Sequence, residues 1–380
     1  MEFDFLKPID THFLEKLSSQ QLGSKIVFHT KDQFPDLNKI NIAVIGVLEN
    51  RGSEIAISDV DLTAIRKELY GMFPGNWDAS IADLGDILAG DTITDTYFAL
   101  RKVVSNLIKN KIIPIVIGGS QDLTYALYRA YDELEQMVNL VSVDSKFDFG
   151  KENQETSASS YLTKIIIDEP NNLFNYCNIG YQTYYNSQEE IDLVEKLFFD
   201  GYRLGEISNN IALAEPVFRD ADIVSLDLNS VKSSDSGNFI TFTPNGFNGK
   251  EICSLARYAG ISDKVSMFGI FNHNNSIQES VLIAQIIWYF IEGFHYRSNE
   301  YPFGSRENYI KYIVPSEEEV LVFYKSDKTD RWWIEIPFIS NGNNKLKRNT
   351  LLPCSYEEYV GACNQELPER WWKAQRKNSI

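Results

Sequence analysis

The chain has 380 residues, of which 43% are hydrophobic and 23% are charged, a composition typical of a globular protein with a substantial core. Its 53 acidic residues against 36 Lys and Arg give a formal net charge of −17, which argues against binding to nucleic acids or anionic membranes, because phosphate groups are bound by clustered Lys and Arg. The four cysteines lack Cys-x-x-Cys spacing, and the chain has neither a signal-peptide pattern nor an apolar run long enough to span a bilayer, so we expect a reduced, cytoplasmic protein.

Short apolar runs rich in β-branched residues alternate with amphipathic stretches at helical spacing through most of the chain. This alternation predicts an α/β fold, in which helices cover both faces of a mainly parallel sheet. The predicted strands are 40–48, 80–84, 112–117, 138–143, 176–179, 223–228 and 265–271. The predicted helices are 59–72, 95–109, 123–134, 188–198, 209–218, 249–258 and 279–292.

The pattern changes from about Asn299 onward. Segments 316–324 and 332–336 predict a β-hairpin around a turn-rich linker, and 356–376 predicts a helical region that Pro368 breaks or kinks. We therefore expect residues 1–298 to form the α/β domain and residues 299–380 to form a small α+β extension packed on it.

The extension is rich in tryptophan, at Trp332, Trp333, Trp371 and Trp372. Because Trp is enriched at interaction hot spots, these side chains could bind a partner. The alternation in residues 331–336 instead favours a strand that buries Trp332, Ile334 and Ile336 on one face. We expect internal packing and keep partner binding as the alternative.

Three short polar segments each close a predicted strand: Gly118–Asp122 (GGSQD), Asp144–Asp148 (DSKFD) and Ser225–Asn229 (SLDLN). In open α/β sheets, ligands bind outside the carboxyl ends of the strands. The three segments are therefore expected to form one shared site.

Together these segments resemble the three signatures of the arginase and agmatinase (ureohydrolase) family, which includes the formimidoylglutamases. The family motifs read Gly-Gly-Asp-His, Asp-Ala-His-x-Asp and Ser-x-Asp-x-Asp, and the members hydrolyse guanidino or formimino groups with two manganese ions. The resemblance covers roughly residues 38–295. It implies a three-layer α/β/α fold and a homo-oligomer.

The resemblance also implies which positions would hold the two ions. The positions of the first ion are Gln121, Asp144, Asp148 and Asp227, and those of the second are Asp144, Lys146, Asp227 and Asn229. Gln121 and Lys146 therefore stand where the family has ligand histidines, and Asn229 stands where it has an aspartate.

A protonated lysine has no lone pair to offer a metal, and nearby carboxylates keep it protonated. We therefore predict that the ammonium of Lys146 replaces the second ion electrostatically, while neutral Asn229 lowers the negative charge in step. No metal cofactor is expected on this hypothesis. The alternatives are a plain salt-bridge network, or one hard cation (Mg, Ca or Mn) at Gln121, Asp144, Asp148 and Asp227, which offer only oxygen ligands.

Other family features are also missing. The substrate loop of active members is matched only loosely by residues 156–160, and residues 268–273 lack the glutamate that orients the guanidinium. The possible pocket residues are Ser120, Ser159, Ser160 and His273. His273 follows a predicted strand, where it could act as an acid or base or simply lie in a surface loop.

The leading hypothesis is thus a pseudoenzyme: a non-catalytic ureohydrolase homologue that binds a small molecule or protein partner, or acts as a scaffold, with no catalytic residue. The alternative is a formimidoylglutamase- or agmatinase-type hydrolase of C–N bonds in linear, non-peptide amidines, with an altered single-cation site. In a third hypothesis Lys146 acts as a nucleophile or Schiff-base former. That role needs a lowered lysine pKa, whereas the neighbouring acids raise it.

Overall fold

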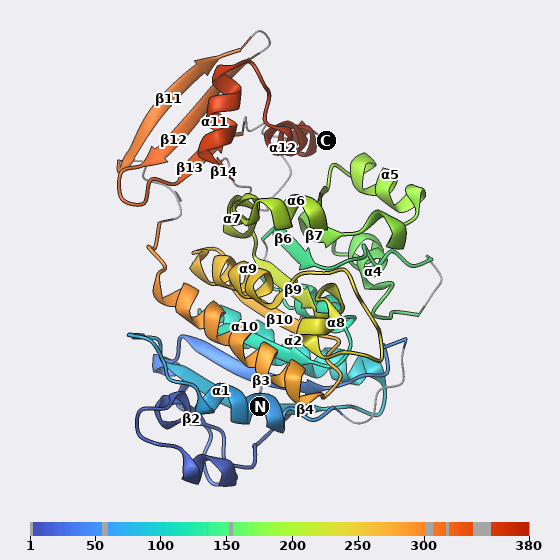
Figure 1. Ribbon diagram of the computed structural model, residues 1–380, viewed down its shortest axis with the longest axis vertical. Coiled ribbons are helices and arrows are strands. Elements are labelled where there is room, and N and C mark those ends of the chain that lie inside the picture. The colour runs from blue at the N-terminus through green and yellow to red at the C-terminus, as the bar shows by residue number, and fades with distance from the viewer. Residues whose placement is uncertain are drawn as a thin grey trace.

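The computed structural model describes residues 3–54, 60–134, 136–151, 155–300, 307–316, 319–336 and 351–379. Figure 1 shows a large α/β body with a smaller sheet and two helices at one end, formed by the C-terminal part of the chain. Among these residues, no helix combines the length and the apolar character needed to cross a membrane.

A ten-stranded sheet forms the centre of the α/β body, with strand order β1-β4-β3-β5-β10-β9-β6-β7-β8 and β2 paired to β4. Its strands are β1 (Leu6–Lys7), β2 (Val27–Phe28), β3 (Ile42–Leu48), β4 (Ile81–Leu88), β5 (Ile113–Gly118), β6 (Val138–Val143), β7 (Leu173–Tyr181), β8 (Asp200–Arg203), β9 (Ile223–Asp227) and β10 (Met267–Phe271). Only the β1–β4 pair is antiparallel among the described strands of this sheet. The predicted parallel sheet is therefore confirmed.

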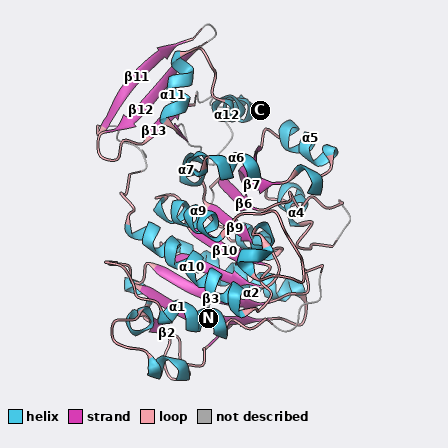
Figure 2. Ribbon diagram, viewed as in Figure 1, coloured by secondary structure: helices cyan, strands magenta, loops and turns pink. Residues whose placement is uncertain are grey.

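Helices cover both faces of this sheet (Figure 2). The helices of the body are α1 (Thr63–Gly71), α2 (Ile93–Lys109), α3 (Leu123–Arg129), α4 (Tyr161–Ile167), α5 (Gln188–Lys196), α6 (Leu204–Asn209), α7 (Ala214–Arg219), α8 (Ser233–Ser236), α9 (Gly249–Ile261) and α10 (Ile277–His295). Helices α1, α6, α7, α9 and α10 share a core with Ile42 and Val44, while α2, α3, α4 and α5 share the other core with Ala43 and Ile45. Successive strand residues thus face opposite layers, as expected for a sheet buried on both sides.

One predicted helix is interrupted in the structure. Instead of one helix over 209–218, the chain forms α6, a short 3-10 turn at Ile211–Leu213 and then α7. Asn210 causes the break, because its side chain accepts a hydrogen bond from the backbone N–H of Ala212 and its backbone leaves the helical region. Pro216 is tolerated in the first turn of α7, where its missing N–H has no helical partner to lose.

The C-terminal extension contains a separate antiparallel sheet with strand order β11-β12-β13-β14. Its elements are β11 (Tyr309–Pro315), β12 (Val320–Ser326), β13 (Trp332–Glu335), β14 (Leu351–Cys354), α11 (Tyr356–Cys363) and α12 (Glu369–Ser379). The β12–β13 hairpin and the helix break before α12 agree with the sequence predictions, whereas β11 and β14 were not predicted. The exact domain boundary at residue 298 stays a prediction.

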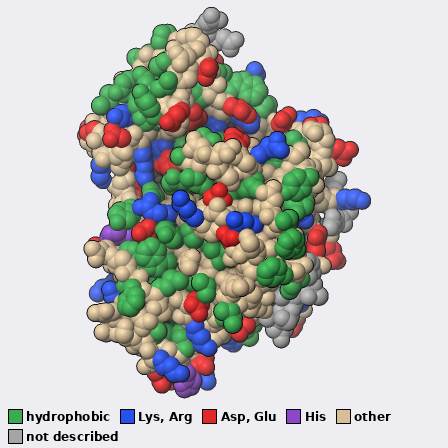
Figure 3. Space-filling view, viewed as in Figure 1, with side chains coloured by type: hydrophobic (Ala, Val, Ile, Leu, Met, Phe, Trp, Pro, Cys, Tyr) green, Lys and Arg blue, Asp and Glu red, His purple; other side chains and the backbone are tan. Residues whose placement is uncertain are grey.

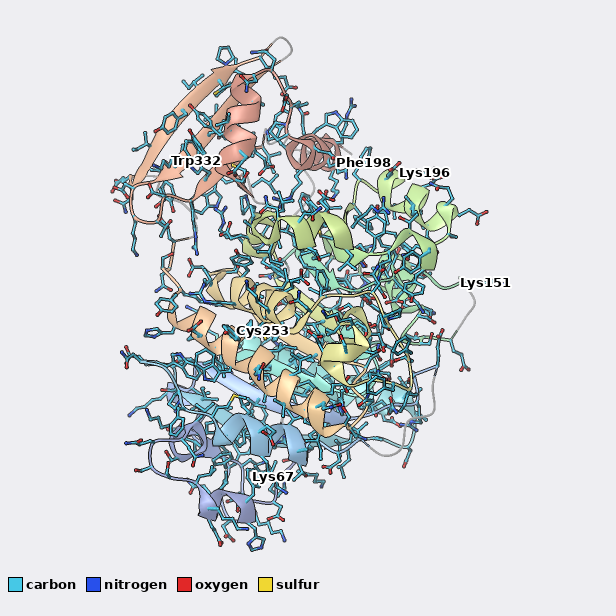
Figure 4. All side chains as sticks on the ribbon, viewed as in Figure 1. Lys67, Lys151, Lys196, Phe198, Cys253 and Trp332 are labelled. Carbon is cyan, nitrogen blue, oxygen red and sulfur yellow. The ribbon has the colours of Figure 1, made fainter. Side chains whose placement is uncertain are left out.

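The tryptophans of the extension pack inside it and against the α/β body. Trp332, marked in Figure 4, lies in a cluster with Phe323 and Trp371. Trp333 is buried on the other face of β13, with the Arg219 guanidinium of α7 4.7 Å from the centre of one of its rings. Internal packing is confirmed, because Trp332, Ile334 and Ile336 lie together in one buried cluster, and Trp333 is buried in addition.

Candidate functional site

The predicted site residues follow neighbouring strands of the central sheet. Strands β5, β10, β9 and β6 lie side by side and parallel, so their carboxyl ends meet at one edge. Gln121 follows β5, Asp144 follows β6, Asp227 ends β9 and Asn272 follows β10. Gly119 allows the chain to turn there, since a Cβ at this position would lie 1.9 Å from the carbonyl oxygen of Glu49.

Three buried aspartates form the floor of the site. Asp144 Oδ1 accepts a hydrogen bond from the backbone N–H of Lys146 at 2.9 Å, and Asp227 Oδ1 accepts one from that of Asn229 at 2.8 Å. Asp144 Oδ2 and Asp148 Oδ2 are buried and find no donor among the surrounding residues. These two carboxyl groups lie within hydrogen-bonding reach of each other, so a shared proton, or a cation bound by both, would satisfy them.

The aspartates carry charge that the protein does not neutralise. Burial raises the pKa of Asp144. Burial, and then the charge of Asp144, raise the pKa of Asp148 and of Asp227 well above the ordinary value. A carboxylate group without a compensating cation takes up a proton instead. The floor of the site is therefore a place where a proton or a cation is strongly favoured.

Gln121 is held within a polar network rather than left free. Its Nε2 donates to Ser142 Oγ at 3.4 Å and to Tyr161 Oη at 3.3 Å, and its Oε1 accepts from Asn272 Nδ2 at 3.4 Å. Its backbone N–H donates to Asn272 Oδ1 at 3.2 Å. Gln121 and Asn272 thus brace each other beside the aspartates.

Lys146 does not occupy the position that the sequence predicted for its ammonium. The side chain is exposed, and within the described residues its ammonium forms no ion pair with Asp144, Asp148 or Asp227. The charge of Lys146 lowers the pKa of each of these acids, but this effect is smaller than those of burial and of the other neighbouring groups. An ammonium group is stabilised by hydration, which explains why this side chain stays exposed to solvent.

Asn229 is also engaged elsewhere. Its Oδ1 accepts hydrogen bonds from Thr241 Oγ1 at 2.9 Å and from Asn238 Nδ2 at 3.5 Å. Both donors belong to the loop after α8. Asn229 thus anchors a loop at the position where the family resemblance implies a metal ligand.

A cavity of about 240 Å³ opens directly above these residues. The predicted site residues that line it are Lys146, Asp148, Ser159, Asp227 and Asn229. Ser120, Ser160 and His273 are buried and do not line it. Asn272, Tyr185 and the loop residues Ile240 to Thr243 also line the cavity and were not predicted. Their positions after a strand and in connecting loops carry no distinctive motif.

His273 and Glu279 are two further polar residues that the fold buries. Both ring nitrogens of His273 and Oε1 of Glu279 are buried without a hydrogen-bond partner. Burial lowers the pKa of His273 to about 4 and raises that of Glu279 to about 7. The expectation that His273 lies in a surface loop was wrong, because its side chain is buried.

These residues suit one cation better than two. The unpartnered oxygens of Asp144 and Asp148 and the nearby Asp227 offer hard oxygen ligands. Within the described residues, no group of three His, Cys, Asp or Glu side chains is already arranged to hold a metal ion, so binding would require these side chains to move. At the position that the family resemblance implies for the second ion, Asp144 and Asp227 remain, while Lys146 is exposed and the side chain of Asn229 holds a loop.

Comparisons with known proteins agree with this geometry. The model of the Arginase family matches residues 49–290. The formimidoylglutamase of Staphylococcus aureus (strain JH9) is 22% identical over 261 residues, which cover 65% of this chain and 82% of that protein.

Solved structures show the same fold at low identity. Trypanosoma cruzi formiminoglutamase with Mn²⁺ superposes with a TM-score of 0.63 at 18% identity, covering 70% of this chain and 97% of that one. Formimidoylglutamase from Bacillus subtilis gives 0.64 at 16%, covering 74% and 93%. Agmatine ureohydrolase of Thermoplasma volcanium gives 0.55 at 17%, covering 75% and 97%. The chain therefore belongs to the arginase family, and it carries an additional antiparallel sheet at its C-terminal end.

Proposed function

We propose that this protein hydrolyses a C–N bond of a linear amidine, in the manner of formimidoylglutamases and agmatinases, with one oxygen-ligated cation in place of two manganese ions. The observation that carries the proposal is the group of buried aspartates beneath the cavity, whose charge Lys146 does not neutralise. The proposal is supported by relatives named as formimidoylglutamases.

Asp144, Asp148 and Asp227 would hold the cation. A bound divalent ion would supply Lewis-acid chemistry at this point. The protein residues perform the remaining tasks. Asn272 keeps Gln121 oriented beside the acids through two hydrogen bonds, and the buried floor limits the access of bulk water.

The charge of the cavity favours an amidinium ligand. The charged residues that line it are Glu54, Lys146, Asp148 and Asp227. Acidic groups outnumber the one lysine, so a cationic head group is attracted toward the floor. Residues 268–273, where the family resemblance implies a glutamate, contain no acid, so this attraction falls to the aspartates.

A second candidate function is a non-catalytic amidine-binding protein, as in the pseudoenzyme hypothesis. The observation that favours it is the engagement of Asn229 by Thr241 and Asn238, together with the lack of an acid in residues 268–273. Such a protein would keep the cavity and lose the reaction.

Metal content and turnover distinguish the two candidates. We expect one divalent ion per chain by elemental analysis after equilibration with Mg²⁺, Ca²⁺ or Mn²⁺. We also expect hydrolysis to release urea from agmatine or formamide from N-formimino-glutamate. Asp148→Asn should lose both the ion and the turnover, whereas Asp192→Asn on α5 should lose neither. Binding without turnover would support the second candidate. Two ions per chain would contradict the single-cation proposal.

We further propose that the protein acts in the cytoplasm as a homo-oligomer and binds a small molecule. The support for this part is family membership and the four unpaired cysteines, of which Cys177, Cys253 and Cys354 are buried. Light scattering coupled to size-exclusion chromatography tests the oligomer directly. A monomer at micromolar concentration would contradict it.

A further inference from the structure

The loop after α8 places apolar side chains on the protein surface beside the cavity. Phe239, Ile240 and Phe242, which we name the apolar lip, are 66%, 63% and 63% exposed. The rings of Phe239 and Phe242 are nearly parallel, with their centres 6.4 Å apart. Figure 3 shows hydrophobic side chains gathered on the surface around α8. Exposing three large apolar side chains together is unfavourable in water and indicates a contact that a ligand or partner provides.

The apolar lip is held in place although it is exposed. Asn238 Nδ2 donates to Thr241 Oγ1 at 2.8 Å, and Thr241 Oγ1 donates to Asn229 Oδ1 at 2.9 Å. The backbone N–H of Thr243 donates to Ser233 Oγ, and the backbone N–H of Ser233 donates to the carbonyl oxygen of Thr243, both at 2.7 Å. These bonds fix both ends of the lip against the chain that follows β9.

The lip and the acidic floor belong to the same cavity. Ile240 and Phe242 line it together with Tyr185, whereas Asp148 and Asp227 line its floor. A ligand that fills the cavity therefore meets carboxylates at one end and apolar side chains at the other. The arrangement matches an amphipathic molecule with a cationic head.

We propose that the ligand of this site is an amidinium or guanidinium compound with an uncharged alkyl or aryl tail, and that Ile240 and Phe242 determine specificity by contacting that tail. The inference rests on the proposed function, because it takes the amidine head from it. Thr241 and Asn229 act as positioning residues for the lip.

Charged tails fit the same cavity less well. A carboxylate tail would approach Glu54, Asp148 and Asp227, with Lys146 as the cation that lines this cavity. An ammonium tail would lose hydration against Ile240 and Phe242 without gaining a partner from these side chains. An apolar tail loses nothing in this contact and removes both its own surface and that of the lip from water.

Three probes with the same head group test the proposal: hexylguanidine, agmatine and 4-guanidinobutyrate. Isothermal titration of the full chain with Mg²⁺ or Mn²⁺ present should give a dissociation constant for hexylguanidine roughly tenfold or more below those of the other two. Affinities that do not depend on the tail would overturn the inference and leave the amidine-binding proposal standing. Failure of all three probes to bind would overturn the proposed function itself.

Substitutions in the lip and elsewhere on the surface test whether the preference for an apolar tail comes from Phe242. Phe242→Ser should weaken hexylguanidine binding by roughly tenfold and leave 4-guanidinobutyrate nearly unchanged. Phe73→Ser is the matched control, because Phe73 is 61% exposed and lies outside the cavity. Neither change removes a buried side chain, so both variants should fold, and their thermal midpoints verify this. Equal effects of the two variants would overturn the role of the lip.

Thr241→Val tests the positioning role. It removes the hydroxyl that donates to Asn229 and should weaken hexylguanidine binding, whereas Thr241→Ser should restore it. Binding of guanidine itself, which has no tail, should be the same in all three proteins. Equal weakening for guanidine and hexylguanidine would contradict a role confined to the tail.

Discussion

Asp148 combines two unfavourable features in one residue. Its backbone lies in the left-handed region, with φ of +57°, and its carboxyl group is buried without a donor for Oδ2. Aspartate tolerates this backbone region better than most residues, yet both features cost stability. Strain and desolvation of this kind are typical of ligand-binding positions. We therefore expect a ligand bound at Asp148 to offset the stability that this residue costs the folded protein.

Restoring the family residues tests the assignment of the metal positions. We expect the triple variant Gln121→His, Lys146→His and Asn229→Asp to bind two manganese ions per chain, because it restores two imidazole ligands and one carboxylate. The carboxylate at 229 can still accept the hydrogen bonds from Thr241 and Asn238. Elemental analysis measures the outcome, and Lys146→His alone serves as the control. A triple variant with no more manganese than the wild type would refute the assignment.

The raised pKa of Glu279 predicts that the stability of the fold depends on pH. Its pKa is about 7 in the folded protein against 4.5 for an ordinary glutamate, so the folded state retains the proton more strongly. Stability is therefore lost as pH rises from about 4.5 to 7. Glu279→Gln removes this loss, and its stability advantage over wild type should grow by about 3 kcal/mol across that interval and then stay constant.

Urea denaturation of both proteins at pH 5 and pH 8 measures this difference. His273, whose pKa is lowered to about 4 against 6.5, has the opposite effect: it costs stability as pH falls through that interval. Because His273 is present in both proteins, its contribution cancels in the comparison. A stability difference that is independent of pH would show that Glu279 ionises normally.

The sequence predicts which residues gather at the site better than it predicts where their side chains point. Asp144, Asp148 and Asp227 meet because each follows or ends a neighbouring parallel strand, and that placement can be deduced from the motifs. The outward turn of Lys146 depends on the local balance between hydration and ion pairing, which a motif does not contain. The partners of Asn229 come from a loop without a recognisable pattern.

At the scale of elements, long apolar segments were predictable and short polar ones were not. Strand β6 agrees at both ends with the prediction, because six successive buried residues leave little ambiguity. Strand β8 (DGYR) has no apolar alternation and exists through its pairing with β7. Strand β14 contains Pro353, which an edge strand tolerates because one side of its backbone needs no partner.

Arg219 joins the C-terminal sheet to α7. Its Nη1 and Nη2 donate to the carbonyl oxygens of Trp332 and Cys354, each at 2.9 Å, while its guanidinium lies over Trp333. Arg219→Ala would remove both of these hydrogen bonds and the contact with Trp333, and should lower the free energy of unfolding by about 2–4 kcal/mol. We expect the region after residue 299 to become the first site of proteolytic cleavage.

Two further variants calibrate this prediction. Arg219→Lys keeps the charge but cannot make both bonds in the planar geometry, so it should also be destabilised. Arg257→Ala removes a partly exposed pair with Glu292 and should cost only about 0–1 kcal/mol. If Arg219→Ala lost no more stability than Arg257→Ala, the docking role of Arg219 would be refuted.

At the scale of the whole molecule, the alternation of strands and helices was enough to predict the layered α/β body. For the C-terminal sheet, the sequence predicted that its tryptophans are buried, but it did not predict which residues hold the sheet against the α/β body. Its docking depends on Arg219 and on the Lys373–Asp200 ion pair, which join segments far apart in the sequence. Contacts of this kind require the three-dimensional arrangement, because no local pattern specifies them.

The uncompensated aspartates couple cation binding to the stability of the entire fold. The proposed cation would bind only the folded state, because unfolding separates its ligands, so stability should rise by about 2.7 kcal/mol when Mg²⁺ or Mn²⁺ reaches a hundred times its dissociation constant. Asp148→Asn should abolish this increase. Without divalent ions at pH 8 the variant should be more stable than wild type, because burial raises the pKa of Asp148 and its ionisation costs stability as pH rises.

Thermal unfolding at matched ionic strength separates specific binding from screening of the net charge of −17. NaCl reduces repulsion among all the acidic residues and should stabilise wild type and Asp148→Asn equally. A divalent ion at the same ionic strength should stabilise the wild type further, and only the wild type. If both proteins responded alike to the divalent ion, the cation would be acting on the general charge of the surface, and the aspartates beneath the cavity would have no part in it.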